Sequence, residues 1–142
     1  MAKTLSEILE TFDSNEAASA RSIEKVERHF GLLFPSDYKT FIAGRDGGEG
    51  FIGNQYLILW RAGELIEFNL DYEVEKYVPG LIFFGSNGGG EAFAFDARPE
   101  GNMGIRMVPF IGMSLNDAKF VAGTFNEFLT RLAESDGSLL QN

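Results

Sequence analysis

The sequence predicts an α+β protein in which N-terminal helices and a C-terminal helix pack on a twisted, mostly antiparallel sheet. Three observations carry this prediction. Apolar residues recur at helical spacing up to about residue 44, short apolar runs separated by glycine-rich turns follow between residues 56 and 111, and a helical pattern returns at Thr124. Strands joined by short turns pair as antiparallel hairpins, and helices at either end of the chain can cover such a sheet.

The first helix is expected to begin at Thr4, which has the capping-box spacing to Glu7. Its apolar face continues to Phe12 at positions i, i+3, i+4 and i+7, and Asp13-Ser14-Asn15 then breaks the pattern. We therefore assign residues 1–19 to an added N-terminal helix region.

Two further helices are expected before residue 45. One runs from Ser22 to Phe30 and ends at Gly31, which can adopt the left-handed conformation of a C-terminal cap. The other begins at Pro35, whose fixed φ and missing N–H suit a helix start, and ends at Gly44. The polar side of the first of these two helices is expected to carry Glu24, Lys25, Glu27 and Arg28.

Beyond Gly44 the period of the apolar pattern changes. The glycine-rich segment 45–50 is expected to be a turn, and Tyr56–Trp60 is expected to be a buried strand. Residues 62–70 suggest a short helix. Leu81–Phe84 and Glu91–Asp96 then form a predicted hairpin around the loop 85–90.

The last strand and the last helix complete the predicted domain. Residues 105–111 form the strand, which Pro109 should end or place at an edge. Thr124 and Glu127 repeat the capping-box spacing before an apolar helical stripe that Asp136-Gly137 closes. Residues 1–137 are thus predicted to be one domain, and residues 138–142 a disordered tail.

Composition restricts the classes of function. The 142 residues carry a net charge of −9, which opposes binding to nucleic acid and to anionic membranes, and favours a basic partner if it does more than maintain solubility. There is no cysteine, which excludes disulfides and thiolate metal sites. The first residues lack the apolar stretch of a signal peptide, so we expect a cytoplasmic protein.

Residues suited to catalysis are few. His29 is the only histidine, and its charged neighbours favour a surface position over a role as a base or metal ligand. The carboxylates between residues 64 and 75 could serve a hydrolase, although their spacing better fits a solvated acidic face. The glycine run before Glu91 lacks the Lys of a phosphate-binding loop. We expect no catalytic residues, no cofactor and no metal. Trp60 is either a core residue or a binding anchor.

Several motifs together resemble the SUKH superfamily, specifically its Smi/Knr-like branch. The resemblance covers residues 20–135 and rests on five segments in order: Ile23–Ile42 with its Phe34-Pro35 and Asp37-Tyr38 pairs, Asp46-Gly47-Gly48, Leu59-Trp60, Phe84–Asp96, and Gly123–Leu129. Two positions depart from the usual pattern, since Asp46 replaces an asparagine and Phe34 a leucine.

The resemblance implies an α+β fold without catalysis, in a protein that acts by binding another protein. Many bacterial members of this family are regarded as immunity proteins that neutralise polymorphic toxins, often nucleases, whereas fungal relatives resemble regulators of cell-wall synthesis that act as interaction proteins. The sequence therefore predicts an immunity protein for a basic toxin domain, with a general scaffold linked to the envelope and a carboxylate hydrolase as alternatives. The predicted contact residues are Asp46, Glu49, Trp60, Asn87, Glu91 and Asp96.

Overall fold

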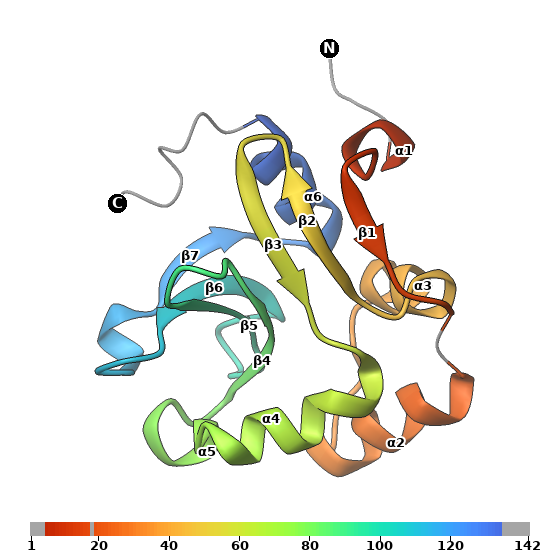
Figure 1. Ribbon diagram of the computed structural model, residues 1–142. Helices are drawn as coiled ribbons and strands as arrows, with labels where there is room; N and C mark the ends of the chain where they lie inside the picture. Colours follow the sequence, from red (N-terminus) through yellow and green to blue (C-terminus); the bar gives the residue numbers. More distant parts are fainter. Residues whose placement is uncertain (1–4, 18, 135–142) are drawn as a thin grey trace.

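A computed structural model describes residues 5–17 and 19–134. Its strands form one open sheet in which neighbours in sequence are neighbours in space, and every pairing is antiparallel (Figure 1). This arrangement confirms the predicted fold class. The seven strands are β1 (Phe12–Ser14), β2 (Gly48–Ile52), β3 (Gln55–Leu59), β4 (Leu81–Ser86), β5 (Glu91–Asp96), β6 (Gly104–Pro109) and β7 (Lys119–Ala122).

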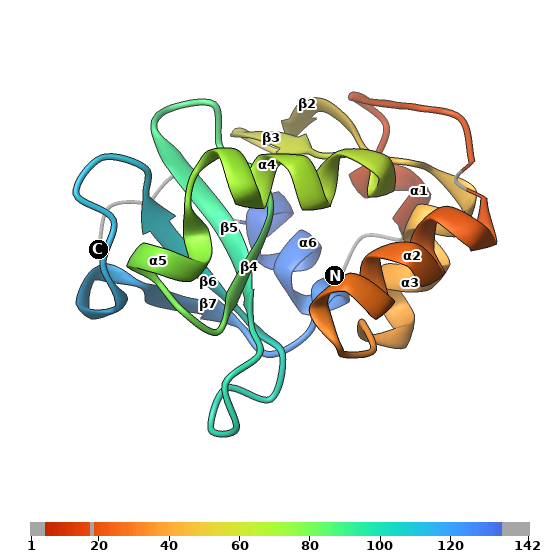
Figure 2. The same ribbon diagram turned by 90° about the horizontal axis from the view of Figure 1, so that it is seen from below.

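Helices cover both faces of the sheet (Figure 2). Figure 2 shows α4 and α6 on opposite sides of the sheet. The side chain of Asn69 in α4 bonds the backbone of Phe83 in β4, and the next residue, Phe84, packs edge-on against Phe128 of α6 with ring centroids 5.7 Å apart. The helical elements are α1 (Leu5–Ile8), α2 (Ala20–Phe30), α3 (Ser36–Gly44), the 3-10 turn η1 (Ala62–Glu64), α4 (Leu65–Asp71), α5 (Val74–Tyr77), the 3-10 turn η2 (Leu115–Asp117) and α6 (Phe125–Glu134). None of the helices in the described part of the chain has the length and apolar character needed to cross a membrane.

The core between α3, α6 and the sheet is built from aromatic rings. Phe84 and Phe95 stack with centroids 4.4 Å apart, and Tyr38 meets Phe95 edge-on at 4.8 Å and Phe125 at 5.1 Å. Each of these rings is at most 2% exposed. Burial raises the pKa of Tyr38, whose hydroxyl has no hydrogen-bond partner among the described residues. Large rings and their edge-to-face contacts therefore supply much of the cohesion of this layer.

The predicted boundaries of α2 and α3 are nearly right. Ser19 caps α2 by accepting a hydrogen bond from the backbone N–H of Ser22 at 3.1 Å, and Gly31 ends the helix with φ of 68°. The prediction that Glu27 lies on the polar side was wrong. Glu27 lies one helical turn after the buried Ile23 and is 6% exposed. Its carboxylate accepts a hydrogen bond of 2.8 Å from the backbone N–H of Phe34, in the segment that follows the helix.

Two strands occupy segments that were predicted otherwise. The predicted first helix continued to Phe12, but α1 ends at Ile8 and Phe12–Ser14 pairs with β2. The predicted turn 45–50 contains the start of β2. Here Gly48 and Gly50 have φ of 142° and 154°, and a Cβ at Gly48 would collide with the carbonyl oxygen of Asp13. The glycines that indicated a turn allow β1 to approach β2 closely instead.

The remaining segments differ less from expectation. β5 has the predicted bounds, and Pro109 ends β6, which lies inside the sheet and not at its edge. The short elements α5 and β7 were not predicted. Thr124 accepts the backbone N–H of Glu127 at 3.1 Å, which confirms half of the second capping box. The predicted cap at Thr4, the helix end at Asp136-Gly137 and the tail lie outside the described residues, and the single-domain assignment stays a prediction.

Candidate protein-binding surface

The first three strands present a side-chain face that is open to solvent. We call it the β1–β3 face and define it by Asp13, Glu49, Phe51, Tyr56 and Ile58. Strand alternation turns these residues outward and turns Phe12, Ile52, Leu57 and Leu59 toward the core and α6, which lies behind β2 and β3 in Figure 1. The register places Asp13 beside Glu49, Glu49 beside Ile58, and Phe51 beside Tyr56.

The face combines carboxylates with exposed aromatic rings. Phe51 is 52% exposed and meets Tyr56 edge-on with centroids 5.1 Å apart. The Tyr56 hydroxyl donates a hydrogen bond to Glu49 at 2.5 Å, and this bond raises the pKa of the phenol above its ordinary value of 10.0. Asp13 and Glu49 are exposed. Exposed rings held beside carboxylates suit a partner that offers both apolar surface and positive charge.

A hollow of about 380 Å³ lies at the η1 end of this face. Three carboxylates line it, from Asp13, Glu49 and Glu64, against one guanidinium, from Arg61. Trp60 forms part of the wall. It is 8% exposed and packs edge-on against Phe68 at 4.9 Å. Trp60 is thus a core residue whose remaining surface borders an acidic hollow, and its use as a binding anchor stays a prediction.

Asp46 connects the segments that border the β1–β3 face and its hollow. Its carboxylate accepts the backbone N–H of Ala62 at 2.7 Å, and its carbonyl oxygen accepts the side-chain amide of Asn15 at 3.0 Å. These bonds connect the turn before β2 to η1 and to the segment after β1. The carboxylate of Asp46 is half-buried and already accepts the hydrogen bond from Ala62. Asp46 therefore holds the segments around the β1–β3 face in place and adds little to its exposed surface.

The β4–β5 loop borders the same face. The Asn87 side chain accepts the backbone N–H groups of Gly89 at 2.8 Å and Glu91 at 3.2 Å, and donates to the Glu91 carboxylate at 3.2 Å. Gly88 packs on Tyr56, since a Cβ at this glycine would lie 3.2 Å from the ring. Asn87 and Glu91 therefore hold a loop that adds one more carboxylate next to the β1–β3 face.

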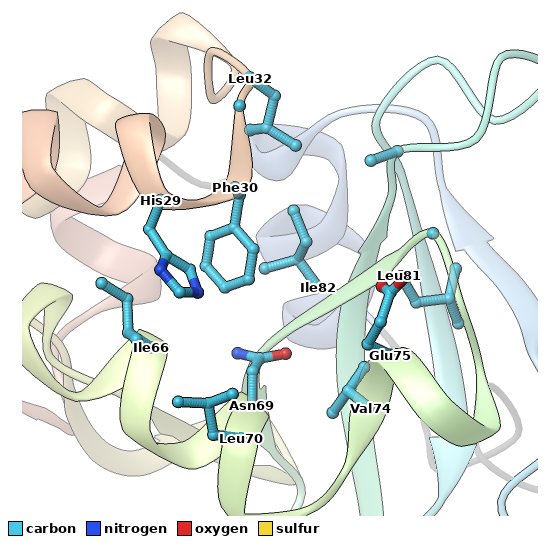
Figure 3. Close-up of a pocket in the computed structure, with 13 residues that line it drawn as sticks. His29, Phe30, Leu32, Ile66, Asn69, Leu70, Val74, Glu75, Leu81 and Ile82 are labelled. Atoms are coloured by element: carbon cyan, nitrogen blue, oxygen red, sulfur yellow. The ribbon is translucent and has the colours of Figure 1, made fainter.

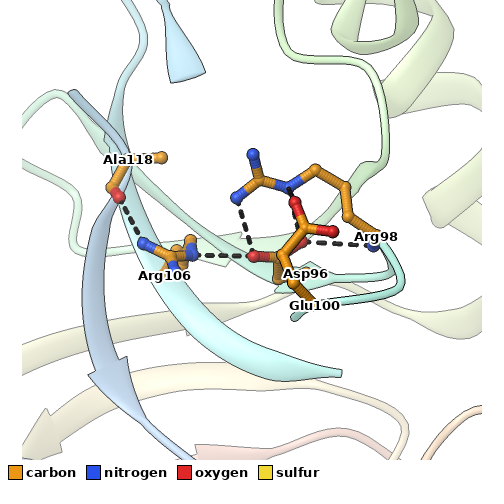
Figure 4. Close-up of polar contacts among 5 residues, drawn as sticks. All are labelled: Asp96, Arg98, Glu100, Arg106 and Ala118. Atoms are coloured by element: carbon orange, nitrogen blue, oxygen red, sulfur yellow. Dashed lines mark hydrogen bonds and ion pairs between the residues drawn. The ribbon is translucent and has the colours of Figure 1, made fainter. Parts of the chain in front are cut away.

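Asp96 does not join the other predicted contact residues. Its side chain is 1% exposed and binds Arg98 through two bonds of 2.8 Å and Arg106 through a third of 2.8 Å (Figure 4). Arg106 also donates to the carbonyl oxygen of Ala118 at 2.8 Å. The bonds from Arg98 and Arg106 lower the pKa of Asp96 to about 2, despite burial. This cluster connects β5, β6 and the segment before β7, and its contacts are structural.

Of the residues at or beside this face, Glu49, Trp60, Asn87 and Glu91 were predicted from the sequence, but the exposed rings and Asp13 were not. One signal was available for the rings. Gly53-Asn54 is a two-residue hairpin turn, and it places Phe51 and Tyr56 opposite each other. Asp13 gave no signal, because its place depends on the pairing of β1 with β2. Within residues 5–17 and 19–134, no three His, Asp or Glu side chains are arranged to hold a metal ion.

Two comparisons with known proteins bear on the chain. The model of the SMI1 / KNR4 family (SUKH-1) matches residues 17–131, which include every strand except β1. YnaB of Bacillus subtilis (strain 168), described as an uncharacterized protein, is 33% identical over 88 residues. These residues make up 62% of this chain and 52% of YnaB, so the match spans about half the length of that relative.

Proposed function

Because this chain belongs to the SMI1 / KNR4 family (SUKH-1), we propose that it is a non-enzymatic protein-binding domain, and specifically a cytoplasmic immunity protein that neutralises a basic toxin domain by direct contact. The observation that carries the proposal is the open β1–β3 face, where the exposed rings of Phe51 and Tyr56 lie next to the paired carboxylates of Asp13 and Glu49. A sheet face with exposed rings is usually covered by another layer, and here a partner would provide it.

Charge supports a basic partner. The chain carries a net charge of −9, and the hollow beside the face holds three carboxylates against one guanidinium. Such a surface accelerates association with a cationic protein and repels nucleic acid. It therefore suits an inhibitor that occupies the basic surface with which a nuclease binds its nucleic-acid substrate. The aromatic rings would then supply the apolar contacts that slow dissociation.

A hydrolase would need an acid whose pKa is raised toward neutrality. Asp96 is displaced in the opposite direction, to about 2, by its two arginines. Asp96 therefore stabilises the fold and is not suited to act as the acid of a hydrolase.

The test begins with a tagged chain recovered from its own host, with co-purified proteins identified by mass spectrometry. A toxin domain identified in this way is then purified and titrated by calorimetry, at low and high salt. We expect the affinity to fall with salt, and to fall at least about tenfold in an Asp13→Asn, Glu49→Gln double variant (about 1.4 kcal/mol). The same variant should protect cells less well from the toxin.

The control is Glu100→Gln, which removes one negative charge where the double variant removes two, and does so at an exposed loop residue outside the face. It should leave affinity unchanged. An affinity that survives both salt and the double variant would refute the role of the face. Stable recovery of envelope-synthesis proteins, with no toxin, would favour the scaffold alternative instead.

A further inference from the structure

A second surface lies between α2 and α4, away from the β1–β3 face. It consists of two adjoining cavities of about 550 Å³ and 440 Å³, both of which are lined by His29, Ile66 and Leu70. Figure 3 shows His29 and Phe30 facing Ile66, Asn69 and Leu70 across its first half, with Ile82 at the base. We call it the α2–α4 groove.

The groove has an apolar floor on a rigid support. Phe30, Leu81 and Ile82 line its first cavity, and Leu70 stands at the rim with 64% of its surface exposed. Asn69 fixes α4 to the sheet beneath, because its side chain donates to the carbonyl oxygens of Leu65 at 2.7 Å and Phe83 at 2.9 Å and accepts the N–H of Phe83 at 2.9 Å. These bonds fix the position of α4 on the sheet, and so the position of this side of the groove.

The charges around the groove are predominantly negative. Glu67, Asp71 and Glu75 line it from α4 and α5, whereas Lys25 and His29 line it from α2. Between residues 62 and 75 the chain has five acidic residues and no basic one. An apolar floor with an acidic bank is complementary to a segment that has an apolar stripe flanked by Lys or Arg.

We propose that the α2–α4 groove binds a basic amphipathic helix of a partner protein. A helix fits better than a strand, because α2 and α4 satisfy their backbone groups internally and offer none for strand pairing. Ridges of a third helix can pack between two others. α2 has 11 residues and so extends about 16 Å, which corresponds to a helix of about three turns with apolar residues at i, i+3 or i+4, and i+7. This inference does not rest on the proposed function.

The test uses two labelled alanine-based peptides of about 18 residues, long enough to form helix in water. Both carry Leu at i, i+4 and i+7, and their flanking charges are all Lys in one and all Glu in the other. Fluorescence anisotropy with the full chain should show saturable binding of the Lys peptide and at least about tenfold weaker binding of the Glu peptide. Asp71→Lys should reduce this preference, because it leaves Glu67 and Glu75 against two lysines among the charged residues that line the groove.

Leu70→Asp should weaken binding of the Lys peptide at least about tenfold without unfolding the chain, since Leu70 is largely exposed. Two variants serve as controls. Ile111→Asp changes an apolar residue that is 94% exposed outside the groove, and Glu49→Lys changes charge on the β1–β3 face. Neither should affect the Lys peptide beyond a small change from net charge. A loss of toxin binding in Glu49→Lys alone would concern the proposed function and leave this inference intact.

Three results would overturn the proposal. One is the absence of saturable binding, and another is an equal effect of Leu70→Asp and Ile111→Asp. The third is self-association of the unlabelled chain, seen by sedimentation and abolished by Leu70→Asp, which would make a second copy the occupant.

Discussion

Replacing Asp96 with asparagine removes the charge at the centre of a buried ion-pair cluster. The carboxylate is 1% exposed and holds Arg98 and Arg106, whose side chains are 25% and 28% exposed (Figure 4). An amide cannot provide two charged acceptors, so both guanidinium groups lose their paired contact. Since each can still reach water, we expect a loss near the lower end of the range for one-sided disruption of a buried pair, about 3–5 kcal/mol.

The pKa of Asp96 gives the electrostatic part of this loss. It is lowered from 3.8 to about 2 in the folded chain. Each pKa unit corresponds to about 1.4 kcal/mol, so the ionised carboxylate contributes about 2–3 kcal/mol to the free energy of unfolding at neutral pH. Because the folded pKa is depressed, this contribution is complete above the unfolded value and is lost as pH falls from about 4 to about 2.

Urea unfolding of the wild-type chain and of Asp96→Asn, at several pH values, measures this directly. The difference in free energy of unfolding should be about 3 kcal/mol near neutrality and should have shrunk by about 1 kcal/mol at about pH 3. Glu100→Gln is the control, because Glu100 lies 3.9 Å from Arg98 but is 69% exposed, and we expect a change within about 0.5 kcal/mol. A difference below about 1 kcal/mol at neutral pH, or one independent of pH, would refute the reasoning.

Four further substitutions test the packing by the same measurement. Gly48→Ala should destabilise the fold by about 2 kcal/mol or more, because its φ of 142° and the backbone of Asp13 leave no room for a Cβ; unchanged stability would contradict the close approach of β1. Tyr38→Phe should be neutral or raise stability by about 1 kcal/mol, since it removes a buried hydroxyl without a partner among the described residues, and a clear loss would reveal a contact of that hydroxyl. Phe41→Ala should cost about 3–5 kcal/mol, as expected of a ring that is 6% exposed, and a cost below about 1 kcal/mol would place it outside the core. Asn69→Ala should cost about 2–3 kcal/mol and speed hydrogen exchange of the Phe83 amide, which stays slow if α4 is held by other contacts.

Helices and hairpins with local signals could be predicted from the sequence. The apolar stripe after Thr124 predicted α6, Gly31 predicted the end of α2, and alternation predicted β5 with its bounds. Each of these signals depends on residues a few positions apart, because steric preferences and helix capping act between residues close in sequence. The family resemblance rests on the same local motifs, and it placed the fold class correctly.

The short strands β1, β2 and β7 depended on partners distant in the chain. A glycine in β2 has the same intrinsic preferences as a glycine in a turn, and only the approach of β1 decides between them. The predicted contact residues show the same division. Glu49 and Asp96 were both predicted as contact residues, yet the strand register placed the first on an open face and the second inside an arginine cluster.

The sequence by itself determined the fold class, the helices with strong periodicity, the hairpin of β4 and β5, and the net negative charge. Only the tertiary structure decided which acidic and aromatic side chains share a surface. Periodicity and capping are properties of neighbouring residues, whereas the β1–β3 face and the α2–α4 groove arise from segments that meet only after folding. The contacts between these segments depend on the free energy of burial and strand pairing across the whole core. A pattern of neighbouring residues does not determine that free energy.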